Sequence, residues 1–153
     1  MREGIRDAPG GMRRAALDDR ALLTHWIRAF YDEAVPGGDD EAEEADRLLE
    51  SRLRAEDEGY FVWEDEGPVS LAGYGGFTPN GARIAPVYTP PEYRCRGYAT
   101  SLTAAVSAWL LGSGRQACFL YTDLANPTSN SIYQRIGYEV VCDSAQYRFG
   151  PAE

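Results

Sequence analysis

The spacing of apolar residues changes from that of helices to that of strands near Gly59 in this 153-residue chain, and this change limits the folds open to it. Before Gly59, apolar residues recur at helical spacing. They predict one amphipathic helix that begins at Asp18 or Asp19 and a more acidic one over about 40–55. After Gly59, the spacing becomes that of strands. Because 153 residues are the length of one ordinary domain, we expect these helices and strands to share a single α/β (α+β) mixed-sheet fold.

The segment after Gly59 begins with a hairpin. Together with a short first strand, the strands are expected over 12–17, 60–64, 69–78 and 82–88. The last two are joined through Asn80-Gly81, which is a strong hairpin signal. Pro86 lies inside the last of them and cannot donate a hydrogen bond to a sheet ladder. The strand must therefore be bulged or unpaired at Pro86.

Alternating helices and strands complete the chain. They are expected as a helix over 97–111, a strand over 117–122, a helix from Asn126-Pro127 to Ile136, and closing strands over 138–141 and 146–149. A hairpin followed by this alternation predicts a mostly antiparallel sheet with helices on both faces. Residues 1–11 are rich in Gly, Pro and charge and are expected to be a flexible N-terminus. Residues 12–153 would then form the single domain.

Acidic residues concentrate in one part of the chain. Between Asp32 and Glu66, fifteen acidic residues stand against three arginines, a net charge of −12 within a chain of net charge −9. A negative protein is repelled by phosphate backbones, so nucleic-acid binding is disfavoured. The acidic run itself fits either a solvated helix face or a guide for a cationic acceptor.

Neither a membrane span nor a metal centre is expected. No apolar run approaches the roughly 20 residues of a membrane helix, and the first residues lack the apolar stretch of a secretion signal, which favours a cytoplasmic protein. The cysteines Cys95, Cys118 and Cys142 lack the paired spacing of zinc sites, and His25 is the one histidine. We therefore predict a protein without a metal. The sequence leaves a monomer and a homodimer open.

Two motifs carry chemistry. The first, Arg94-Cys95-Arg96-Gly97-Tyr98-Ala99, stands between a strand and a helix and offers backbone N–H groups, a glycine, a small residue and positive charge to an anion such as a pyrophosphate. The second is N-x-x-S-x-x-I-Y-x-x-x-G-Y over 126–138. Its helix follows the carboxyl end of the 117–122 strand, where ligands of open α/β sheets bind. Both motifs are therefore expected at one edge of the sheet.

These motifs resemble those of a known family. The stretch VYTPPEYRCRGYATSLTAAV resembles the acyl-CoA-binding core of the GNAT superfamily of N-acyltransferases, whose loop signature falls here on Arg94, Gly97 and Ala99. The stretch YTDLANPTSNSIYQRIGYE is similar to a later motif of the same family. The resemblance covers about 12–149 and implies a GNAT-like three-layer fold, with a splayed sheet and helices on both faces.

The resemblance also implies an activity, the transfer of an acetyl group from acetyl-CoA to a primary amine of a small molecule or protein. The residues that would contact acetyl-CoA are Val87, Tyr88, Thr89, Arg94, Arg96, Gly97, Tyr98, Ala99, Thr100, Asn126, Ser129 and Tyr133. Within this set, Arg94 to Thr100 would hold the pyrophosphate, and backbone groups of Val87 and Thr89 would bond the pantetheine amides.

Catalysis would use Tyr133 as the proton donor to the leaving thiolate. Asp123 is the first candidate for the base that takes a proton from the amine, and Glu92 is the second. Two other functions stay open at this point: a non-catalytic acyl-CoA-binding regulatory module, and an acyltransferase toxin that acts on charged transfer RNA. The −12 stretch disfavours the toxin.

Overall fold

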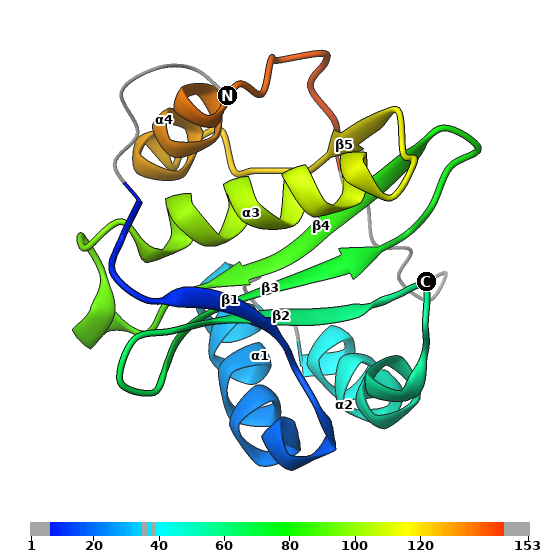
Figure 1. The fold of residues 1–153 in the computed structure, drawn as a ribbon, viewed down its shortest axis with the longest axis vertical. Coiled ribbons are helices and arrows are strands. Elements are labelled where there is room, and N and C mark those ends of the chain that lie inside the picture. Colours follow the sequence, from blue (N-terminus) through cyan, green and yellow to red (C-terminus); the bar gives the residue numbers. More distant parts are fainter. Residues whose placement is uncertain (1–6, 35–36, 38, 146–153) are drawn as a thin grey trace, which may run out of the picture.

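A computed structural model of the chain describes residues 7–34, 37 and 39–145. These residues contain one five-stranded sheet in the order β1-β2-β3-β4-β5 (Figure 1). The strands are β1 (Gly11–Arg14), β2 (Gly59–Glu64), β3 (Pro68–Gly75), β4 (Gly81–Tyr88) and β5 (Ala117–Phe119). The first four strands pair antiparallel, and β5 pairs parallel with β4. The predicted mostly antiparallel mixed sheet is confirmed.

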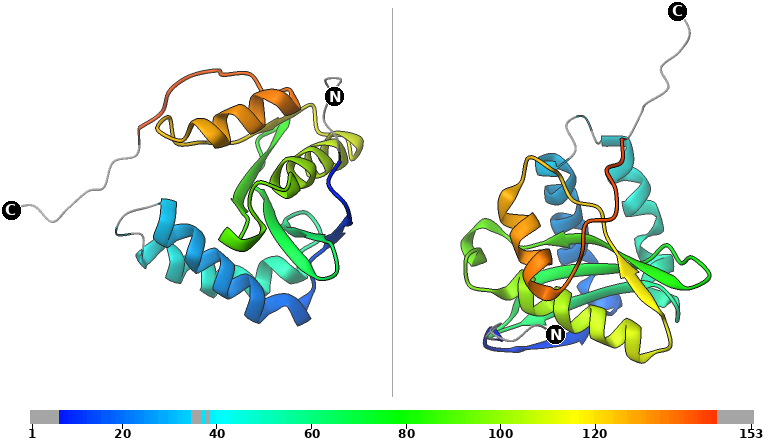
Figure 2. Two further views of the ribbon diagram at one scale, coloured as in Figure 1. Left: turned by 90° about the vertical axis from the view of Figure 1, so that its left-hand side faces the viewer. Right: turned by 90° about the horizontal axis from the view of Figure 1, so that it is seen from above.

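Helices cover both faces of this sheet, so the fold has three layers. The α-helices are α1 (Arg20–Ala34), α2 (Asp39–Arg54), α3 (Tyr98–Gly112) and α4 (Pro127–Ile136), and two short 3-10 helices are η1 (Leu17–Asp19) and η2 (Pro91–Tyr93). Figure 1 and the left view of Figure 2 show α1 and α2 on one face of the sheet and α3 and α4 on the other. A membrane-spanning helix is absent from the described part of the chain.

Each face of the sheet has its own apolar core. Phe61 and Ile84 pack with Leu102 on the α3 side. Tyr60 and Val62 belong to the core on the α1 and α2 side. Neighbouring residues of β2 therefore face opposite layers, as the two-residue period of a strand requires.

The start of the described chain is packed rather than loose. Ala8 is buried, and its backbone N–H donates to the hydroxyl of Ser101 at 2.8 Å. The indole N–H of Trp63 donates to the carbonyl of Pro9 at 2.8 Å. Groups of α3 and β2 thus bond the backbone of Ala8 and Pro9, while the flexible N-terminus over 1–11 stays a prediction. Residues 1–6 lie outside the described residues, and the single domain over 12–153 stays a prediction.

The predicted irregularity at Pro86 is confirmed as a bulge between β3 and β4. Ala72 lies opposite Val87, and Tyr74 lies opposite Ile84. The two residues Ala85 and Pro86 therefore oppose the single residue between Ala72 and Tyr74, which is Gly73. A bulge of this kind bends its strand and increases the local twist. It re-aims the end of β4.

Gly73 is required by this bulge. A Cβ at Gly73 would lie 2.4 Å from the carbonyl oxygen of Ala85, which is backbone and cannot swing aside. We expect Gly73→Ala to lower the free energy of unfolding by about 1–3 kcal/mol, as overpacking does. Urea denaturation measures this change. The control is Gly112→Ala, where nothing lies within 4 Å of the added Cβ and alanine suits a helix better. Equal stability of Gly73→Ala and wild type would contradict the steric reading.

The ladder between β4 and β5 is short, so the sheet is splayed. It comprises Gly81–Arg83 against Ala117–Phe119. We predicted a buried strand over 117–122, but β5 ends at Phe119 and is a partly exposed strand. The cause lies in β4, which bends away at its bulge and leaves the next residues of the β5 segment without a backbone partner.

The prediction of a strand over 138–141 is wrong. These residues carry no ladder, and Val140 and Val141 are 76% and 92% exposed. Among the described residues, β5 is the last strand of the sheet on this side, so the valines have no neighbour to pair with. The partner strand predicted over 146–149 lies outside the described residues.

Candidate active site

The anion-binding motif forms the turn that opens α3. Gly97 is the N-cap residue with φ of 83°, and Cys95 has φ of 63°. The backbone N–H of Ser101 donates to the carbonyl of Gly97 at 3.0 Å, which begins the helical ladder. No side chain of the described residues caps the N–H groups of Tyr98, Ala99 and Thr100. The first turn of α3 thus presents unpaired donors and the positive end of the helix dipole, which together suit a phosphate.

Tyr98 anchors this turn to the sheet. Its hydroxyl donates to Asp65 Oδ2 at 2.5 Å, and Asp65 lies in the turn between β2 and β3. The pKa of Tyr98 is raised, first because of this bond to a carboxylate and then because of burial. The side chain therefore fixes the start of α3, and the backbone N–H of Tyr98 remains one of the uncapped donors of the first turn.

Arg94 makes three contacts within the protein. Its Nε donates to the carbonyl of Thr89 at 2.8 Å, and its Nη2 pairs with Glu33 Oε2 of α1 at 2.7 Å. Its guanidinium also lies over the ring of Tyr88, 5.7 Å from the centroid. We predicted Arg94 as a pyrophosphate ligand. In the structure, its guanidinium joins the end of β4 to α1, and Glu33 offsets part of its charge.

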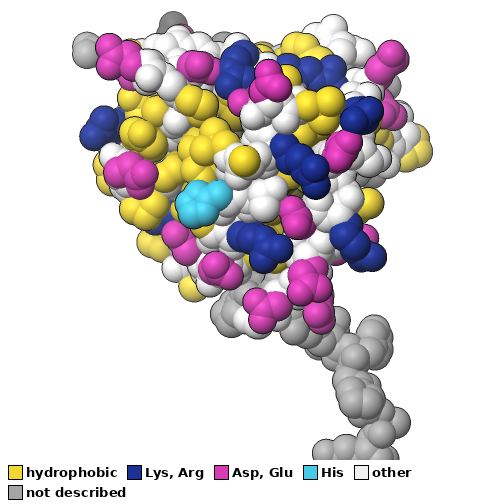
Figure 3. All heavy atoms as spheres, turned by 90° about the horizontal axis from the view of Figure 1, so that it is seen from below, with side chains coloured by type: hydrophobic (Ala, Val, Ile, Leu, Met, Phe, Trp, Pro, Cys, Tyr) yellow, Lys and Arg dark blue, Asp and Glu magenta, His cyan; other side chains and the backbone are white. Residues whose placement is uncertain are grey.

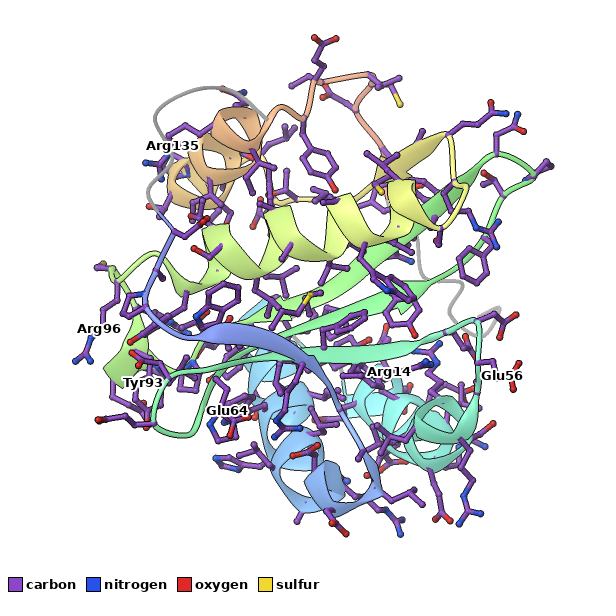
Figure 4. All side chains as sticks on the ribbon, viewed as in Figure 1. Arg14, Glu56, Glu64, Tyr93, Arg96 and Arg135 are labelled. Atoms are coloured by element: carbon purple, nitrogen blue, oxygen red, sulfur yellow. The ribbon has the colours of Figure 1, made fainter. Side chains whose placement is uncertain are left out.

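Arg96 is the more open arginine of the loop. Figure 4 shows Arg96 pointing away from the body of the protein beside the start of α3. Arg135, in the last turn of α4, lies on the same side of this view. Sequence reasoning did not single out Arg135, because one arginine at a helix end is common. Two elements thus bring positive charge to this end of the molecule.

The end of β4 is held by a buried serine. Ser70 Oγ donates to the carbonyl of Tyr88 at 3.2 Å and lies 2.8 Å from Thr89 Oγ1. Val87 packs against the core of the α3 side, and burial raises the pKa of Tyr88. Ser70 fixes the backbone of the strand end where the sheet has splayed. A lone serine in an apolar strand gives no sequence signal for such a role.

α4 begins where the motif predicts. Asn126 Oδ1 accepts the backbone N–H of Ser129 at 3.1 Å, and Pro127 is the first helical residue. Tyr133 is half-buried two turns later, and burial raises its pKa. Its phenol therefore keeps its proton at neutral pH, which a proton donor requires.

The two candidate bases are exposed. Asp123 Oδ1 accepts the N–H of Ala125 at 2.9 Å, and its carbonyl accepts the N–H of Asn126 at 3.0 Å. Asp123 thus shapes the turn that leads into α4. Glu92 lies in η2, just before the turn that opens α3. The role of each carboxylate stays a prediction.

The acidic stretch forms much of α2, and part of it borders a hollow between α1 and α2. The hollow has a volume of about 350 Å³ and is lined by Tyr31, Asp40, Glu41, Glu44, Ala45, Leu48 and Arg52. Several carboxylates of α2 are paired with arginines: Glu44 with Arg47, Asp46 with Arg28 at 3.5 Å, and Glu50 with Arg20 at 3.3 Å. Figure 3 accordingly shows acidic and arginine side chains interspersed.

Comparisons with known proteins agree with this geometry. The profile of the Acetyltransferase (GNAT) family matches residues 20–138. The fold is similar to that of a GCN5-related N-acetyltransferase from Ralstonia eutropha JMP134, at 19% identity and a TM-score of 0.75, over 92% of this chain and 99% of that one. It is also similar to the aminoglycoside N-acetyltransferase AAC(6')-Iy in complex with CoA, at 22% identity and a TM-score of 0.71, over 94% and 97% of the two chains. No curated protein matches significantly.

Proposed function

The chain belongs to the Acetyltransferase (GNAT) family, and from this premise we propose that it transfers the acetyl group of acetyl-CoA directly to a primary amine. The observation that carries this proposal is the end of the β4–β5 ladder at Arg83 and Phe119. Beyond this pair, the backbone edge of β4 is free to bond the amides of a pantetheine arm. The uncapped first turn of α3 lies at one end of that edge, and α4 flanks it.

The residues at this edge suit the co-substrate. The backbone of Val87 and Thr89 would bond the pantetheine, while the N–H groups of 98–100 and the charge of Arg96 would meet the pyrophosphate. Gly97 supports this assignment, because among the described residues a Cβ there would meet Ala8 alone, at 3.8 Å. In the part of the chain that the structure describes, the approach to the helix end is therefore open. Asn126 and Ser129 would flank the arm at the start of α4.

The chemistry asks three things of the protein. A base must take a proton from the ammonium form of the acceptor, for which Asp123 and Glu92 are the candidates. A backbone N–H near the bulge must stabilise the oxyanion, and one such donor is worth about 3 kcal/mol in other enzymes. Tyr133 must protonate the leaving thiolate. Since a free thiol has a pKa near 8.5 and an unperturbed tyrosine near 10, this transfer gives a moderate gain in rate.

An amine panel tests the proposal. Purified protein is mixed with acetyl-CoA and with small amines, polyamines, amino acids and basic peptides, and thiol release is followed. We expect release that depends on at least one amine and on enzyme concentration. Binding of acetyl-CoA without amine-dependent release would instead indicate a non-catalytic acyl-CoA-binding module. Absence of binding at millimolar acetyl-CoA would remove both functions.

The acidic hollow predicts that a cationic acceptor is favoured. The negative electrostatic field of its carboxylates attracts a protonated amine. Salt screens this field, because the Debye length falls from about 10 Å at 0.1 M to about 3 Å at 1 M. We expect kcat/KM for a polyamine or a basic peptide to fall at least threefold over this range while kcat changes little, because the effect lies on association.

Charge removal at the hollow should reproduce part of this loss. The triple variant of Glu41, Glu43 and Glu44 to Gln should lower kcat/KM at low salt and flatten the salt dependence. Glu43→Gln alone is the control, because Glu43 is exposed on the same helix but does not line the hollow. A triple variant equal to wild type for every cationic acceptor would leave the acidic run as a solvated helix face.

A further inference from the structure

We infer that Tyr138 and Ser107 are positioning residues that hold Tyr133 in place, an inference that rests on the proposed role of Tyr133. The rings of Tyr133 and Tyr138 meet edge to face, with centroids 6.2 Å apart and an interplanar angle of 67°. The hydroxyl of Tyr138 lies 2.7 Å from Ser107 Oγ on α3. Tyr138 therefore joins the candidate proton donor to the helix beneath it.

The direction of this hydrogen bond follows from counting protons. Ser107 Oγ donates to the carbonyl of Thr103 at 2.7 Å. A serine hydroxyl has one proton, so Ser107 can only accept from Tyr138. The phenol of Tyr138 is thus the donor, and the chain of bonds runs from Tyr138 through Ser107 into the backbone of α3. Burial raises the pKa of Tyr138 to about 12, so this donor keeps its proton at any physiological pH.

The backbone ties the same two tyrosines together. The N–H of Tyr138 donates to the carbonyl of Tyr133 at 3.0 Å, and the N–H of Gly137 donates to the same carbonyl at 3.2 Å. Gly137 ends α4 with φ of 122°, which turns the chain back over the helix. Tyr138 is therefore fixed to residue 133 by its main chain and to α3 by its side chain.

Tyr133 depends on such support. Among the described residues its hydroxyl has no protein hydrogen-bond partner, so the packing of its ring decides where the phenol lies. A proton donor acts only within hydrogen-bond reach of the leaving group, and a misplacement of about 1 Å can cost 100-fold in rate. Loss of the Tyr138–Ser107 hydrogen bond should let the Tyr133 ring shift. It should therefore lower kcat without changing the binding of acetyl-CoA.

Two variants remove this anchor from opposite ends. Tyr138→Phe keeps the ring and removes the donor, and Ser107→Ala removes the acceptor. Each should lower kcat about tenfold with an unchanged KM for acetyl-CoA, and the double variant should lose no more than either single variant, because both break one bond. Ser113→Ala is the control: it removes a serine bond to the carbonyl of Leu110 at the far end of α3 and should keep full kcat.

A cycle with Tyr133→Phe separates positioning from general support of the fold. In that background, Tyr138→Phe should cause no further loss, since no proton donor remains to be placed. Two results would overturn the inference: an equal loss from Tyr138→Phe in the wild-type and Tyr133→Phe backgrounds, or no loss from Tyr138→Phe in the wild-type background.

Fluorine NMR of protein labelled with 3-fluorotyrosine decides the contact without turnover. The Tyr133 resonance is assigned by its absence from Tyr133→Phe. It should shift in Ser107→Ala, although Ser107 acts on Tyr133 only through Tyr138. An unmoved resonance would overturn the inference. A wild-type protein that acetylates no amine would overturn the proposed function alone, and the fluorine spectrum would still settle whether Ser107 positions Tyr133.

Discussion

Replacing Gly97 with glutamate should abolish the binding of acetyl-CoA. The added carboxylate would stand at the mouth of the uncapped first turn of α3, where it would repel the pyrophosphate and compete for the N–H groups of that turn. At 100 times its Kd, acetyl-CoA should stabilise wild type by about 2.7 kcal/mol, which raises the Tm by roughly 5 to 10 °C for a domain of this size. The variant should show no such rise in calorimetry.

The effect of the added charge in Gly97→Glu must be distinguished from the effect of backbone strain. Gly97 has φ of 83°, so any side chain there is strained whatever the space around it. Gly97→Gln carries the same strain and nearly the same volume without the charge. We expect it to lower the unliganded Tm as much as Gly97→Glu does, yet to keep a measurable rise with acetyl-CoA. Equal binding by the two variants would show that charge at this position does not matter, and a full rise in Gly97→Glu would remove the loop from the cofactor site.

The sequence was sufficient to predict those parts of the fold that depend on residues adjacent in the chain. Pro86 predicts the bulge because a missing N–H is a property of one residue. Asn126-Pro127 predicts the start of α4 because cap and first turn are adjacent. The hairpin at Asn80-Gly81 also forms, although its loop is longer than two residues, since Thr78 N–H bonds the carbonyl of Gly81 at 3.1 Å.

Contacts between distant residues were out of reach of such signals. The pair of Arg94 with Glu33 joins residues 61 positions apart, and no pattern in either segment indicates it. The same holds for Tyr138 with Ser107, which are 31 positions apart. Both contacts bear on the candidate site. The Arg94–Glu33 pair engages a side chain that was predicted to bind the pyrophosphate. The Tyr138–Ser107 bond holds the neighbour of the predicted proton donor.

The wrong strand over 138–141 has a related cause. Valine suits a strand because its branched side chain packs on a pleated surface, but that preference is realised only beside another strand. Among the described residues, Val140 and Val141 have no strand beside them, and both are exposed. The partner predicted for them, over 146–149, lies outside the described residues, so the preference of valine did not by itself suffice to predict a strand.

Tyr133→Phe should lower kcat by about 10- to 1,000-fold, because it keeps the ring and removes the proton for the leaving thiolate. The KM for acetyl-CoA should change little, since the contacts proposed for the pyrophosphate lie in the first turn of α3 and not at Tyr133. Burial raises the pKa of Tyr133 above its usual value of 10. Wild type should therefore lose its Tyr133-dependent rate only as the pH rises through that raised pKa, and the variant should lack this alkaline limb.

Tyr74→Phe is the matched control for this substitution. Tyr74 is also buried, but it belongs to β3, and its ring packs against Phe61 and Trp109 in the core on the α3 side. It should keep the kcat and the pH profile of wild type. The comparison is valid only where the chemical step limits kcat. A pre-steady-state burst of product would show that a later step limits it instead. If Tyr133→Phe then retains full kcat across the pH range, the thiolate leaves without help from this phenol, and Tyr133 has no part in the mechanism.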